Sequence, residues 1–217
     1  MPDEQLRMTV IITTQTPLSI GAGGSSGTLA DKSVLRDGNG WPIIPGSQVK
    51  GKVRHAAEQI IAALGLPGQR DFNDDETDVN SIRTIFGSPR HASPLFFDDL
   101  GLTLVPHAVR RAEVDSVLRP SVALNRQRRV AEDNRLLFQE VLHEGVVFQG
   151  NPAISGRLSL AHTALVWAAL RLCTRWGGAT SRGLGWASVE VEVTFGNQVL
   201  QEDALKTALH DLHKEAA

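Results

Sequence analysis

The chain has 217 residues, 41% of them hydrophobic and 21% charged, and a formal net charge of −2 at pH 7. These values predict one globular domain with a sizeable core. No apolar run is long enough to span a membrane, and the amino terminus lacks the basic-then-apolar layout of a signal peptide, so we expect a cytoplasmic protein with no membrane partner. The single cysteine, Cys173, excludes a disulfide and a cysteine-based zinc site.

The basic residues are biased towards arginine, with 17 Arg against 5 Lys. Arginine binds phosphate through two parallel hydrogen bonds, so this bias favours a nucleic-acid partner despite the negative net charge. A basic cluster is also commonly a solvated face, and charge alone leaves both interpretations open. Because there is no tyrosine and few other aromatic residues, we expect recognition of an RNA backbone rather than a row of stacked bases.

The first half of the chain predicts a strand, a glycine-rich loop and a helix, in that order. The β-branched run 6–14 is typical of a strand, and the glycine-rich stretch 19–32 follows it. A short hairpin is expected around the turn at 37–39. A helix is then predicted from an N-cap at Ser47 to about residue 64.

The second half predicts a short helix over 79–86 and a strand within 94–105, followed by a polar segment over 110–150. We interpret that segment as an insertion, an extended hairpin or loop that leaves the core. An apolar helix over 157–176, a strand from 187 and an amphipathic helix over 201–214 complete the chain. This order predicts an α+β fold of ferredoxin-like type, with residues 1–217 forming a single domain.

Glycine-rich loops near both ends of the chain are the first candidate binding features. Glycine lets main-chain N–H groups approach a phosphate closely, and hydroxyl and arginine side chains add donors. Such a loop is equally compatible with a plain helix end and turn, but two loops far apart in sequence suggest one binding face. The candidate residues are Gly23 and Gly24 in the first loop, and Gly177, Gly178, Thr180, Ser181, Arg182, Gly183 and Gly185 in the second.

Two basic clusters are the remaining candidates. The start of the helix predicted from Ser47 has free N–H groups that favour an anion, and basic side chains lie on the same turn. The second cluster lies within the insertion. The candidate RNA-binding residues are Ser47, Lys50, Lys52 and Arg54 at the helix start, and Arg126, Arg128 and Arg129 in the insertion.

Several of these segments together resemble the RAMP superfamily, and most closely the small backbone subunits of type III CRISPR effectors. The resemblance covers residues 8–195. It rests on the first glycine-rich loop ending in Asp31, the stretches 34–54, 94–100 and 122–148, and the terminal glycine-rich loop, all in family order.

The resemblance implies an RNA-recognition-motif-like domain that repeats as a filament of copies along a guide (CRISPR) RNA, beside other effector subunits. It also implies that the insertion is a thumb that kinks the guide–target duplex, and that Asp31 cleaves the target RNA. A carboxylate there would orient the ribose 2′-OH, alone or by holding a divalent metal such as Mg²⁺. Asn125 departs from the family pattern, in which an aspartate commonly precedes the thumb arginines.

Other functions stay open at this stage. Without the resemblance, the simpler interpretation is that Asp31 caps a turn or pairs with Lys32. The chain would then be a non-catalytic RNA-binding scaffold. A guide-RNA processing endoribonuclease would use a histidine such as His55, but the chain is short for two ferredoxin-like halves. A small-molecule phosphate enzyme is disfavoured because residues 46–51 lack the P-loop spacing.

Overall fold

The computed structural model describes residues 3–21, 32–66, 80–103 and 116–215. The elements are β1 (Glu4–Thr14), α1 (Gly46–Ala63), α2 (Ser81–Phe86), β2 (Leu95–Phe97), β3 (Gly101–Leu102), β4 (Val117–Asn125), β5 (Val130–Val141), β6 (Val147–Leu158), α3 (Leu160–Leu172), the 3₁₀ turn η2 (Thr180–Arg182), β7 (Ala187–Phe195), β8 (Gln198–Leu200) and α4 (Glu202–Glu215).

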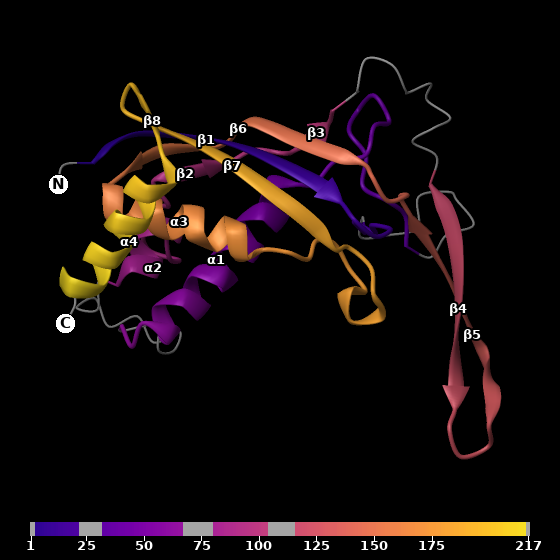
Figure 1. Cartoon of the computed structure of the whole chain (residues 1–217). Helices are drawn as coiled ribbons and strands as arrows, with labels where there is room; N and C mark the ends of the chain where they lie inside the picture. The colour runs from indigo at the N-terminus through magenta and orange to yellow at the C-terminus, as the bar shows by residue number, and fades with distance from the viewer. Residues whose placement is uncertain (1–2, 22–31, 67–79, 104–115, 216–217) are drawn as a thin grey trace.

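The main sheet is built on β1, which pairs antiparallel with β6 on one side and with β7 on the other. The strand order is β2-β6-β1-β7-β8, and β3 pairs with β6 as well. Alternate side chains of β1, from Leu6, Met8, Val10 and Ile12, are fully buried, so one face of the sheet forms the core. The helices cover that face, and the opposite face is open (Figure 1).

The helical layer is held by apolar faces that match the helical period. From α1, Val49, Val53, Ala57 and Ile61 are buried at spacings of three and four residues. Helix α3 packs against α1, β7 and α4. The antiparallel sheet with its covering helices confirms the predicted α+β class.

Two predicted helix boundaries are wrong. Helix α1 begins at Gly46 with Pro45 as its N-cap, so Ser47 lies inside the first turn and caps nothing. Helix α3 spans 160–172 instead of 157–176. Residues 157 and 158 continue β6 opposite the start of β1, and the hydroxyl of Ser159 accepts a hydrogen bond from the N–H of His162 as the N-cap.

The polar insertion contains a long hairpin. Strands β4 and β5 form a separate two-stranded sheet that projects from the body of the domain (Figure 1). Pro120 lies opposite Phe138 and Val122 opposite Leu136. The predicted boundary at residue 150 is too late, because residues 147–150 already pair with β1 as part of β6.

The buried carboxylate of Glu140 holds the base of this hairpin. It accepts hydrogen bonds from the N–H of Val34 at 2.6 Å, from the Arg36 guanidinium at 2.8 Å and from the hydroxyl of Ser116. The backbone of Lys32 also binds β5, since its carbonyl accepts from the N–H of Glu140 at 2.9 Å. The segment that begins at residue 32 is therefore fastened to the hairpin and to the chain entering it.

These donors decide the protonation of Glu140. Burial by itself raises the pKa of the Glu140 carboxyl, but the hydrogen bonds from Ser116, Val34 and Arg36 outweigh it and hold the pKa below its ordinary value. Because the pKa is lower in the folded protein, the ionised carboxylate stabilises the fold above the unfolded glutamate pKa of about 4.3. That stability is lost as the pH falls through the folded value.

We expect Glu140→Gln to lower the free energy of unfolding at pH 7 by about 1 to 3 kcal/mol, because charge-assisted hydrogen bonds are replaced by weaker ones. Glu132→Gln is the matched control, since Glu132 is exposed and 4.0 Å from Arg135, and should change stability by less than about 0.5 kcal/mol. Urea unfolding between pH 3 and 8 measures both. A Glu140→Gln deficit that does not shrink towards pH 3 would contradict this role.

Candidate nucleic-acid interface

The terminal glycine-rich loop packs against the chain that leaves β1. The N–H of Gly178 donates to the carbonyl of Ser19 at 2.7 Å, and the N–H of Gly185 donates to the carbonyl of Pro17 at 2.9 Å. The structure thus brings the start of the first glycine-rich stretch against the second, as the one-face hypothesis requires. Gly23, Gly24 and Asp31 themselves lie outside the described residues.

Two glycines of the loop are required by this packing. A Cβ on Gly177 would lie 2.3 Å from the carbonyl oxygen of Ser19, and one on Gly185 would lie 1.9 Å from that of Trp176. Both also have positive φ angles, of 69° and 77°. These two positions therefore serve the close approach of backbone to backbone, which any side chain would prevent.

The other two glycines leave the backbone open to a ligand. A Cβ on Gly183 would meet nothing within 4 Å, and one on Gly178 would meet only the Ser19 oxygen at 3.8 Å. Between them lies η2, in which Thr180 is half-buried and Ser181 and Arg182 are exposed. No carboxylate of the described residues pairs with Arg182. The loop thus offers bare backbone, two hydroxyls and a cation on its outer side.

The basic residues on α1 have different neighbours. Arg54 forms an ion pair with Glu58 at 3.0 Å, and the Lys50 ammonium lies 5.8 Å from the centre of the Phe97 ring. Burial raises the pKa of the Cys173 thiol, at the end of α3, to about 11, and the positive charge of Lys52 opposes that rise.

The start of α1 already holds an anion. The carboxylate of Asp99 accepts a hydrogen bond from the N–H of Gly46 at 2.8 Å, which is the first N–H of the helix. Ser47 beside it is exposed. The sequence-based hypothesis of a phosphate at this helix start is therefore weakened, because the carboxylate would repel it.

The tip of the hairpin is cationic. Arg126, Arg128 and Arg129 lie in the turn between β4 and β5 and are exposed, and none pairs with a carboxylate in the described part of the chain. Asn125 closes the turn: its side-chain oxygen accepts from the N–H of Arg128 at 3.0 Å, and its carbonyl accepts from the N–H of Arg129 at 2.8 Å. Asparagine and aspartate both supply that oxygen, so the departure at Asn125 leaves the turn intact.

Arg175 and Trp186, at the two ends of the terminal loop, were missed by the sequence reasoning. The guanidinium of Arg175 lies 4.2 Å from the centre of the Trp186 ring. Only their position beside the glycines could have pointed to them, because the two residues are separated along the chain and their contact depends on the loop closing.

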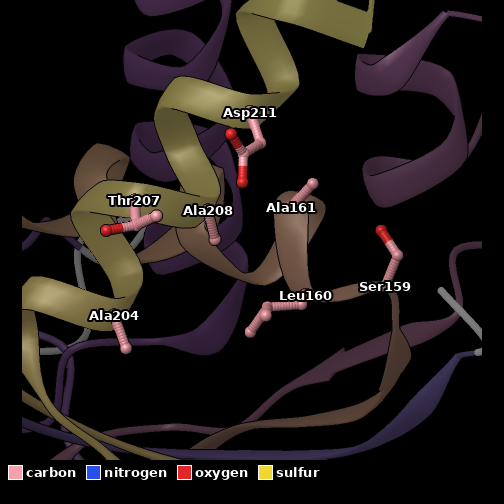
Figure 2. A pocket seen from close by; sticks show the side chains of 7 residues that line it. All are labelled: Ser159, Leu160, Ala161, Ala204, Thr207, Ala208 and Asp211. Carbon is pink, nitrogen blue, oxygen red and sulfur yellow. The ribbon is translucent and has the colours of Figure 1, made fainter.

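A pocket of about 360 Å³ lies elsewhere, between the start of α3 and the outer helix α4 (Figure 2). Leu160, Ala204 and Ala208 line it with apolar groups, and Asp211 is its charged side chain. Among the described residues that line it, one is acidic and none is basic, so this pocket is unsuited to an RNA phosphate.

Within the described ranges, no group of three or more histidine, cysteine, aspartate or glutamate side chains is arranged to hold a metal ion. The residue expected to hold one, Asp31, is outside those ranges. No helix in the described part of the structure is long and apolar enough to cross a membrane.

Comparisons with known proteins identify the family to which the sequence is similar. The sequence model of the RAMP superfamily matches residues 11–188. The CRISPR system Cms endoribonuclease Csm3 of Enterococcus italicus is 37% identical over 87 residues, which is 39% of this chain and 38% of that relative.

Among solved structures, a subunit in the cryo-EM structure of the type III-B Cmr-beta complex bound to cognate target RNA superposes with a TM-score of 0.62 at 18% identity. The match covers 89% of this chain and 62% of that subunit, and at this identity it speaks for the fold alone. Since the superfamily model spans most of the chain, from the middle of β1 into β7, the protein belongs to the RAMP superfamily.

Proposed function

We propose that the protein is a guide-RNA-binding backbone subunit of a type III CRISPR ribonucleoprotein and that it cleaves complementary target RNA with Asp31. One observation carries the proposal: the open glycine-rich loop lies against Ser19, and the next described residue after Asp31, Lys32, is bound to the hairpin base. The described chain before Asp31 is thus bound to the glycine-rich loop at Ser19, and the described chain after it is bound to the hairpin at Lys32. The relative named an endoribonuclease supports the activity.

The finer description of the fold is part of this proposal. The order β2-β6-β1-β7 places the third strand of a βαββαβ unit beside the first, with α1 and α3 as the connecting helices, as in a ferredoxin-like domain. The hairpin β4–β5 is inserted between β3 and β6 and would act as the thumb. Its exposed arginine tip supports contact with a nucleic acid.

The guide RNA would bind through its backbone. The lack of a side chain at Gly178 and Gly183 lets a phosphate approach the loop, and Ser181 and Arg182 supply the donors, because the N–H groups of both glycines already donate to the carbonyls of Ser19 and Thr180. Gly23, Gly24 and Thr180 would add to the same face, and Lys50, Lys52 and the tip arginines would hold phosphates further along. Contacts of this kind position an RNA without reading its bases.

Asp31 would act on the target strand. Its carboxylate would orient a ribose 2′-OH and accept its proton as the 2′ oxygen attacks the adjacent phosphorus. The new bond joins O2′ to phosphorus and the bond to O5′ breaks, leaving a cyclic phosphate and an O5′ that takes a proton from water to become a 5′-OH. A divalent metal, for which we propose Mg²⁺, would lower the cost of the charge that develops on the phosphate.

The partners follow from this role. Target RNA, further copies of the chain in a filament and other effector subunits would surround each protomer in the cytoplasm. The superposed Cmr-beta complex is bound to target RNA, which supports RNA as a partner of this chain as well. A non-catalytic scaffold of the same kind is the second candidate, and Asp31 separates the two.

We expect Asp31→Asn to lower target cleavage by at least about 100-fold, because a positioned carboxylate is lost without a change of shape. Guide and target binding should stay within about twofold. Asp203→Asn is the matched control, since the side chain of Asp203 is exposed on α4, and should cut normally. Complexes are incubated with labelled complementary RNA, with Mg²⁺ or with EDTA. Undiminished cutting by Asp31→Asn would exclude Asp31 as the catalytic residue, and wild-type complexes that bind target RNA without cutting it would indicate the scaffold function.

Phosphate contacts are tested by the salt dependence of guide binding. Lys50→Ala and Arg182→Ala should each weaken binding and lower the slope of log K against log salt by about 0.7. Arg54→Ala should do less, because Arg54 is shared with Glu58. Arg157→Ala is the control, since Arg157 lies at the end of the sheet away from the glycine-rich loop, where its guanidinium donates to the carbonyl of Asp3. If all four variants kept the wild-type slope of log K against log salt, the proposed phosphate contacts of Lys50 and Arg182 would be wrong.

Replacing residues 124–130 with a short Gly-Ser turn tests the thumb. These residues are at the exposed end of the hairpin, so the melting temperature should change little. Cleavage should lose its regular spacing, because nothing would displace the target nucleotide presented to Asp31. Cleavage ladders of reconstituted complexes measure the spacing. A folded variant that cuts at the original positions would exclude a wedge at the tip.

A further inference from the structure

Arg175 and Trp186 close the two ends of the terminal glycine-rich loop. They form an isolated antiparallel bridge, and the guanidinium lies 4.2 Å from the centre of the indole ring. Three hydrogen bonds fix the backbone of Trp186. Its N–H donates to the hydroxyl of Thr16, and its carbonyl accepts from the N–H groups of Gln15 and Thr16. The backbone that carries the ring is therefore fixed by hydrogen bonds that do not depend on the arginine.

Trp186 is more exposed than the core requires. It is 37% exposed, whereas Trp167 and Trp176 are buried at 6% and 0%. No carboxylate in the described ranges pairs with Arg175. A cation–π contact at an exposed site contributes only about 0.5 to 1 kcal/mol to stability. An aromatic ring and a cation without a carboxylate partner are thus both exposed to solvent, although their contact contributes little to the stability of the fold.

Arg175 and Trp186 lie where the base of a nucleotide would be if the glycine-rich loop bound its phosphate. Gly183 and Gly178, where the backbone is bare, lie on the same loop that the pair closes, and Arg182 is exposed between them. A phosphate held by the loop would leave its own or the next base beside the indole. Aromatic and guanidinium planes both stack on any base, because every base has a π face.

We propose that Trp186, with Arg175 against it, is a stacking platform for one base of the RNA bound at the glycine-rich loop. The inference rests on the proposed RNA binding and is independent of cleavage by Asp31. The ligand is an RNA base, from the guide or from the target. The platform adds affinity without selecting a base, which suits a subunit that must accept any guide sequence.

Tryptophan fluorescence of the full-length chain tests the platform, with single-stranded RNA of the guide sequence as the probe. RNA should quench the wild-type emission. The quenching should disappear in Trp186→Phe and persist in Trp41→Phe, since Trp41 is half-buried on another segment. Adding complementary target after the guide identifies the source: quenching at the first addition indicates a guide base, and quenching only at the second indicates a target base.

Affinity gives a second readout. Trp186→Ala should weaken RNA binding by about 5- to 100-fold with the salt slope unchanged, because stacking releases no counterions. Trp186→Phe should retain most of the affinity, and it keeps the test valid if the alanine variant unfolds. Quenching that survives in Trp186→Phe, or wild-type affinity in a folded Trp186→Ala, would overturn the platform. Wild-type protein that binds no RNA would overturn the proposed function as well, whereas cutting by Asp31→Asn would overturn only the catalytic role.

Discussion

The organisation of the candidate site depends on one buried carboxylate. Glu140, at the base of β5, accepts hydrogen bonds from Val34 and Arg36, in the segment that precedes α1, and from Ser116, in the chain that enters the hairpin. A buried charge is stable only when its donors are all in place, so these segments must be correctly positioned together. The chain that follows Asp31 and the hairpin therefore behave as one unit.

The glycines of the terminal loop divide into two groups with different physical roles. Gly177 and Gly185 permit contacts with backbone carbonyls that a Cβ would block, and they set the position of the loop against the chain leaving β1. Gly178 and Gly183 face open space and leave the main chain accessible. Substitution at the first pair would disturb the fold, and so would substitution at Gly183, whose φ of 84° strains any side chain, whereas substitution at Gly178 would affect mainly what binds there.

The part of the open face that β7 forms is a poor RNA surface on electrostatic grounds, although RNA-recognition domains commonly bind RNA on the open face of their sheet. Glu190 and Glu192 of β7 are exposed there, opposite Ile11 and Thr9 of β1. In β1, β6 and β7, which the structure describes in full, no open-face position carries an aromatic residue for stacking. The exposed aromatic residue of this face is Phe96 on the edge strand β2, opposite Ser155 of β6 and away from the glycine-rich loop along β6. The cations that we assign to RNA binding, and the exposed ring of Trp186, lie instead on other segments, and the glycine-rich loop at the end of the sheet is where we place the RNA.

The sequence by itself determined the elements whose pattern is strong: the alternation of β1, the helical period of α1 and the apolar α3. For residues 110–150 it predicted an insertion and left a hairpin and a loop as alternatives, and the structure shows the hairpin. It also predicted the two glycine-rich loops, since clustered glycines indicate positive φ angles or close contacts between backbone segments. The tertiary structure decided the rest. Asp99 occupies the start of α1, Glu58 neutralises Arg54, and Arg175 meets Trp186 because each contact depends on how the folded chain places its side chains. Local patterns record the preferences of neighbouring residues, whereas charge pairing, capping and stacking between segments depend on distances that only the folded chain defines.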